Sequence, residues 1–127
     1  MKKKPWIWVL RVSGVLFLVT VLGQALLAGL FVSGDIGFLN MHELNGTIVG
    51  VASIVWLVAA LALRAPRLIL VGAVALTATG AQIGLGHSRG LELHIPLGVL
   101  LFGAAIVVTM LSFSYRAESA APRVESA

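Results

Sequence analysis

Two histidines, His42 and His94, carry the side chains best suited to chemistry in this sequence of 127 residues. Each is followed four residues later by a glycine, Gly46 or Gly98, and each lies near the start of a long apolar stretch. A neutral imidazole nitrogen can bind a metal ion or carry a proton. Residues i and i+4 share one face of a helix, so each glycine leaves space beside its histidine, one turn further along.

A glutamine precedes each histidine inside an apolar segment, Gln24 before His42 and Gln82 before His94. The order glutamine, histidine, glycine therefore occurs twice, which indicates an internal duplication of a two-helix unit. A buried amide in a membrane helix can join two helices by hydrogen bonding. It can also line a pocket next to the histidines, and the sequence leaves both roles open.

The composition indicates a membrane protein: 59% of the residues are hydrophobic and 11% are charged, whereas charged residues form about a quarter of a soluble domain. The apolar stretches 12–31, 43–63, 68–86 and 94–113 each approach the roughly 20 residues that cross a bilayer. We expect an all-α integral membrane four-helix bundle at 1–113, running up-down-up-down, and a disordered cytoplasmic tail at 114–127. A cleaved signal peptide is the alternative for the first stretch, but its match to the third stretch favours a retained helix.

The formal net charge of +4 does not indicate a nucleic-acid partner, because the positions of the basic residues fit a membrane topology. Basic residues flank the stretches on one side, and Arg89 alone lies on the other. By the positive-inside rule, both termini are cytoplasmic and both histidine-bearing connections lie outside a cell inner (plasma) membrane. The expected partner is therefore the lipid bilayer. The basic residues on the cytoplasmic side are Lys2, Lys3, Lys4, Arg11, Arg64, Arg67, Arg116 and Arg123.

The absence of cysteine excludes disulfides, thiolate-held iron–sulfur clusters and thioether-attached haem. The best remaining hypothesis is a b-type haem, because histidine is a common axial ligand of haem iron. His42 and His94 would lie at one membrane depth on diagonal helices and bind the iron from both sides. A porphyrin could fill the gaps at Gly46 and Gly98, and Arg89 could pair with a propionate. Gln24 and Gln82 would line the pocket, while Glu43, Asn45, Glu92 or a main-chain carbonyl would orient the imidazoles.

Other functions remain open. The histidines could be structural, or they could bind a bare metal ion or protons, and His87 could be a ligand or a solvated loop residue. A cofactor-free structural or accessory subunit of a larger membrane complex is the main alternative. A transporter would need ionisable residues at mid-membrane, where only glutamine and threonine occur. Enzymatic activity is not expected, because two axial histidines leave no open position on the iron.

The segment Gln24-Ala25-Leu26-Leu27-Ala28-Gly29, together with His42 and His94, resembles small bacterial four-span membrane proteins of unknown function. The same histidines resemble those of one half of haem A synthase, a four-helix bundle of the b-type cytochrome kind. That resemblance implies axial ligation by His42 and His94. The enzyme has two such halves and this chain has one, so a homodimer is one possible arrangement. A single haem cannot span the roughly 30 Å hydrocarbon core, so any electron transfer requires a redox partner on the outer side.

Overall fold

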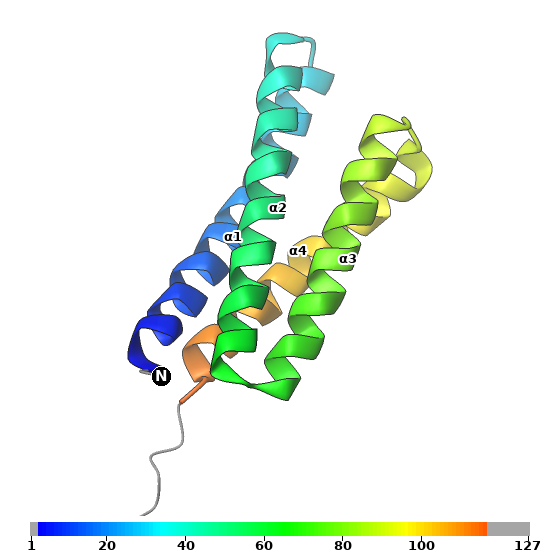
Figure 1. The fold of residues 1–127 in the computed structure, drawn as a ribbon. Helices are drawn as coiled ribbons and strands as arrows, with labels where there is room; N and C mark the ends of the chain where they lie inside the picture. The colour runs from blue at the N-terminus through cyan, green and yellow to red at the C-terminus, as the bar shows by residue number, and fades with distance from the viewer. Residues whose placement is uncertain (1–2, 117–127) are drawn as a thin grey trace, which may run out of the picture.

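The protein is an antiparallel bundle of four helices in a computed structural model that describes residues 3–116. The helices are α1 (Lys3–Val32), α2 (Gly37–Leu63), α3 (Pro66–His87) and α4 (Leu91–Ser114), and they run up, down, up and down (Figure 1). All four are long and apolar enough to cross a membrane. The expected all-α membrane bundle is thereby confirmed, and the chain is a multi-pass membrane protein.

Each helix contacts its two neighbours in the bundle: α1 packs on α2 and α4, and α3 packs on the same two helices. The diagonal pairs have no backbone contacts, but the side chains of His42 on α2 and His94 on α4 meet across the bundle axis, with ring centroids 6.3 Å apart. The connections 33–36 and 88–90 lie at one end, called here the histidine end. The turn between α2 and α3 lies at the opposite, terminal end, with both ends of the described chain (Figure 1).

The helices extend beyond the predicted spans, and this corrects the placement of both histidines. Helix α2 begins at Gly37 instead of at residue 42 or 43, and α4 begins at Leu91 instead of at His94. The connection between the first two helices is therefore only 33–36. Hydropathy marks the part of a helix that lies in hydrocarbon, whereas the helix itself continues as far as its backbone finds partners. Each histidine therefore lies within the first two turns of its helix and is held by helical backbone.

Local contacts account for these earlier starts. The Asp35 carboxylate accepts a hydrogen bond from the Gly37 N–H at 3.2 Å, and the Gly90 carbonyl accepts one from the His94 N–H at 2.9 Å. Pro96 consequently lies inside α4. Of the tail predicted at 114–127, Ser114 is the last residue of α4, and residues 117–127 lie outside the described residues.

Arg64 and Ala65 form a tight turn between α2 and α3. Arg64 ends α2 in the left-handed conformation with φ 55°, and its N–H bonds to the carbonyl of Leu61 at 3.0 Å. Pro66 then starts α3 at a position where its missing N–H has no helical partner to lose. This two-residue connection forces α2 and α3 to lie side by side.

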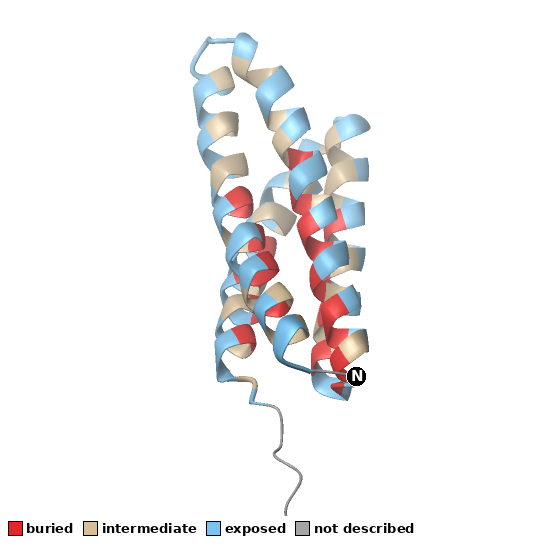
Figure 2. Cartoon of the chain, turned by 60° about the vertical axis from the view of Figure 1, so that its left-hand side comes forward, coloured by how far each residue is buried: buried red, intermediate tan, exposed pale blue. Residues whose placement is uncertain are grey.

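The buried core fills the terminal half of the bundle, as Figure 2 shows by the red segments near the N-terminus. Trp56, Phe17 and Leu10 are its largest fully buried side chains. The Trp56 indole N–H donates to the Ser112 hydroxyl at 2.7 Å, which satisfies its polar atom inside the apolar core. The core therefore ties α1, α2 and α4 together at one end and leaves the histidine end less tightly packed.

Close packing at Gly72 gives a direct test of this core. A Cβ atom at Gly72 would stand 2.8 Å from Trp56 Cζ3 and 3.0 Å from Leu57 Cδ1, whereas nothing lies within 4 Å of one at Gly103. Overpacking a core costs about 1–3 kcal/mol. We expect Gly72→Ala to lower the thermal unfolding temperature in detergent and Gly103→Ala to leave it unchanged or slightly raised. Equal behaviour of the two variants would contradict the packing of α3 on Trp56.

Candidate functional site

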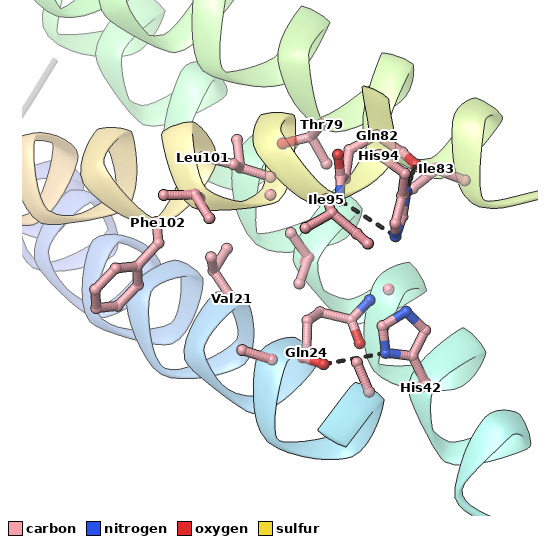
Figure 3. Close-up of a pocket in the computed structure, with 16 residues that line it drawn as sticks. Val21, Gln24, His42, Thr79, Gln82, Ile83, His94, Ile95, Leu101 and Phe102 are labelled. Atoms are coloured by element: carbon pink, nitrogen blue, oxygen red, sulfur yellow. Dashed lines mark hydrogen bonds between the residues drawn. The ribbon is translucent and has the colours of Figure 1, made fainter. Parts of the chain in front are cut away.

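Helices α1 and α2 form one helical hairpin, and α3 and α4 form the other. A cavity of about 310 Å³ lies between these two hairpins, toward the histidine end. Figure 3 shows His42 and His94 entering it from opposite sides, with Gln24 and Gln82 beside them. Apart from these four residues its walls are almost entirely apolar. The other lining residues are Val21, Ala25, Ala28, Gly46, Val49, Thr79, Ile83, Ile95, Gly98, Val99, Leu101 and Phe102.

Both imidazoles are oriented by the main chain of the preceding helix. His42 Nδ1 lies 3.1 Å from the carbonyl oxygen of Gln24, and His94 Nδ1 lies 2.9 Å from that of Gln82. A carbonyl oxygen only accepts hydrogen bonds, so each Nδ1 carries the proton and donates it. In the neutral form of such a ring, Nε2 is the nitrogen with the free electron pair, as in a metal-binding histidine.

The two Nε2 atoms point toward the same space, although His94 Nε2 also lies 3.3 Å from the amide nitrogen of Gln82. In Figure 3 the Nε2 atoms of His42 and His94 face each other across the gap between the hairpins. The ring centroids lie 6.3 Å apart and the ring planes are inclined by 62°. A metal–imidazole bond is about 2.0–2.1 Å and each ring adds roughly 1.1 Å to its centroid, so two imidazoles on opposite sides of one ion have centroids about 6.3 Å apart. The observed spacing matches that arrangement.

The glycines after the histidines make room for the glutamine amides. A Cβ atom at Gly46 would stand 2.9 Å from Gln24 Nε2, and one at Gly98 would stand 3.0 Å from Gln82 Nε2. The gap in which a porphyrin edge was expected is thus filled by amide groups. Any larger residue at either position would displace the amide, so the glycines act on the site through the glutamines.

The two hairpins differ in how they hold the amide. Asn45 Nδ2 donates to Gln24 Oε1 at 3.1 Å and to the Thr20 carbonyl at 2.8 Å. No donor reaches Gln82 Oε1, which is buried and has no hydrogen-bond partner within residues 3–116. An unpaired buried acceptor costs about 1–3 kcal/mol, so the buried amide of Gln82 is less stabilised than that of Gln24.

The cavity wall is closed on one side and exposed on the other. Val49 on α2 and Thr79 on α3 are buried, whereas Ile95 and Val99 on α4 line the cavity and remain 64% and 69% exposed. Ala25, on the facing side of α1, is also exposed. In a bilayer such surface meets lipid, so the seam between α1 and α4 forms a mouth through which a ligand could extend toward the hydrocarbon.

The residues present fit a haem group in two respects. The two imidazoles stand at the spacing of axial ligands, and the surrounding walls are apolar. The cavity volume falls at the low end of the roughly 300–1,000 Å³ of small-molecule pockets, so a porphyrin would also occupy the mouth. Within the described residues no group of three or more metal-binding side chains occurs, and a fixed multi-ligand metal centre therefore has no support.

Two sequence candidates lie away from this cavity. Arg89 sits in the connection 88–90 with φ 59° and is not among the cavity-lining residues, so the structure does not bring it to the imidazoles. His87 is exposed at the end of α3, where its Nδ1 bonds to the Ile83 carbonyl at 2.9 Å. That bond caps the local chain, and His87 contributes nothing to the cavity wall.

Sequence reasoning missed the role of Asn45 toward Gln24 and the cavity wall formed by α1. Val21, Gln24, Ala25 and Ala28 follow the spacing i, i+3, i+4, i+7 of one helix face, and that pattern was available in the sequence. The expected orientation of the imidazoles by a main-chain carbonyl is found for both histidines. Comparison of this chain with protein-family models, with curated proteins and with solved structures gives no match.

Proposed function

We propose that this chain is a membrane protein that binds haem b through His42 and His94 and serves in electron transfer or haem handling. The observation that carries the proposal is the 6.3 Å spacing of the two rings, with each Nδ1 anchored and each Nε2 directed into one gap. Apolar walls favour a flat hydrophobic ligand over a hydrated ion. The resemblance of the histidine pattern to one half of haem A synthase supports the same function.

The proposed orientation places the histidine end outside a bacterial inner (plasma) membrane, with both termini in the cytoplasm. It rests on the basic residues that gather at the terminal end, such as Lys3, Arg11, Arg64 and Arg67. A haem near the outer face cannot by itself carry electrons across the roughly 30 Å core. Its electron donor or acceptor is therefore a partner that docks at the histidine end or a membrane complex that supplies further cofactors.

An absorption spectrum of the purified protein tests this function. The protein is produced with added haem precursor, purified in detergent and recorded oxidised and after reduction with dithionite. We expect a Soret band, a sharp α band on reduction and about one haem per chain by the pyridine haemochrome assay. A protein that stays colourless after purification and after haem titration would contradict the proposal.

One observation favours a second function, that of a cofactor-free subunit of a larger membrane complex. Both nitrogens of His94 have hydrogen-bond partners inside the bundle, the Gln82 carbonyl and the Gln82 amide, as expected of a histidine that only joins α3 to α4. This function predicts a colourless protein in which His94→Ala alters stability alone. The absorption spectrum distinguishes the two proposals directly.

A further inference from the structure

The two histidines differ in the surroundings of their free nitrogens. The Gln82 amide Nε2 lies 3.3 Å from His94 Nε2; since that nitrogen carries the electron pair, the amide donates to it. No hydrogen bond to His42 Nε2 is found in the described part of the chain. An ion at His94 Nε2 therefore has to displace an amide, whereas an ion at His42 Nε2 does not.

The sequence difference at one matched position explains this asymmetry. Asn45 lies three residues after His42 and holds the Gln24 amide through its oxygen. The residue three positions after His94 is Leu97, whose side chain has no hydrogen to donate to Gln82 Oε1. Gln24 is therefore fixed by a third residue, while the Gln82 amide is fixed only by the His94 ring.

The packing around the two rings also differs. The Phe31 ring lies against His42 in a T-shaped arrangement, with ring centroids 5.6 Å apart. His94 instead lies against Gly86, where a Cβ atom would stand 3.0 Å from the ring carbon Cε1. An aromatic side chain contacts His42, whereas the backbone of a glycine contacts His94.

We propose that His42 is the permanent axial ligand and His94 the exchangeable one, because the Gln82 amide competes for His94 Nε2. The inference rests on the proposed haem binding and extends it. If haem is held by His42, the pairing of His94 with Gln82 would leave the iron free to bind a small neutral ligand such as a diatomic gas. The apolar cavity and its mouth between α1 and α4 give such a molecule access from the lipid.

The asymmetry can be tested without haem by modifying the imidazoles with diethyl pyrocarbonate, which acylates an unprotonated ring nitrogen. The haem-free protein is treated for increasing times, and modification of each histidine is measured by peptide mass spectrometry. We expect His42 to react about tenfold faster than His94, the factor for one hydrogen bond. Gln82→Ala should bring His94 close to the rate of His42, whereas Gln24→Ala should leave the His94 rate unchanged. Equal rates in the unmodified sequence would overturn the inference.

Carbon monoxide tests the exchangeable position in the haem-loaded protein. The reduced protein is expected to bind carbon monoxide slowly, with a shift of the Soret band, and His94→Ala to bind it without the slow phase. Leu97→Asn supplies the donor that Asn45 supplies in the other hairpin, so it should slow binding about tenfold. Leu97→Met, of similar size but without an amide, serves as the matched control and should bind like the unmodified protein.

The outcomes separate the two proposals. A protein without a Soret band contradicts haem binding itself. A low-spin haem protein whose reduced spectrum does not change under carbon monoxide keeps the proposed function and overturns the exchangeable ligand. Equal binding rates in Leu97→Asn and Leu97→Met would overturn the role assigned to Gln82.

Discussion

In the proposed haem site, alanine at His42 or at His94 is expected to remove the sharp low-spin α band entirely, because each variant would leave the iron with one axial imidazole. Removing a residue that only hydrogen-bonds to a metal ligand weakens metal binding about 10- to 100-fold. Removing the ligand itself should weaken binding more. Bound haem should fall most in His42→Ala, since the Nε2 of His42 is not engaged by an amide. Reduced spectra and haem content per chain, measured after identical purification, give the result.

The matched control for these variants is His87→Ala. His87 is exposed, bonds only to the carbonyl of its own helix and does not line the cavity. It should keep full haem content and an unchanged α band. A spectrum that survives in His42→Ala and His94→Ala but is lost in His87→Ala would place the haem at the end of α3 and contradict the site described above.

The fold was predictable because the pattern of apolar stretches that determines it extends over most of the chain. Uninterrupted apolar stretches separated by charged or glycine-containing connections leave few alternatives to antiparallel spans. The turn at Arg64 and Pro66 was predictable for the same reason, since proline stops one helix and starts the next. Only the helix ends were misplaced, because hydropathy does not identify residues such as Gly37 and Leu91 that continue a helix outside the hydrocarbon.

The pairing of the histidines was also predictable, because the repeated pattern places His42 and His94 at one depth. Its details depend on helix rotation and on side-chain geometry, which a spacing pattern does not contain. The glycines at 46 and 98 illustrate this: the sequence showed a gap, and the structure shows that an amide fills it. One difference between the hairpins is Asn45 in the first and Leu97 at the matched position of the second. Its consequence could be recognised only in the structure, where Gln82 Oε1 is unpaired.

Arg89 was assigned to the site because it is the only lysine or arginine on the histidine side of the sequence. It lies in the connection 88–90 and does not line the cavity, because the helical backbone that fixes His94 begins at Leu91. Its pairing with a haem propionate stays a prediction.

Tryptophan at Ala25 is expected to block haem uptake while leaving both histidines in place. Ala25 is exposed and lines the cavity at the seam between α1 and α4, so an indole there would occupy the mouth and part of the roughly 310 Å³ interior. Haem content per chain should fall at least about tenfold, since a ligand excluded from the cavity loses the apolar contacts that bind it. The measurement is haem titration of the purified, haem-free protein, followed at the Soret band.

Leu26→Trp is the matched control, because Leu26 is the next residue on α1, is 65% exposed and does not line the cavity. It adds the same side chain on the lipid-facing surface and should bind haem normally. Similar unfolding temperatures of the two variants would show that the difference arises at the mouth and not from a destabilised bundle. If Ala25→Trp binds haem as well as Leu26→Trp does, the ligand does not occupy this cavity, and the spacing of His42 and His94 serves to join the two hairpins.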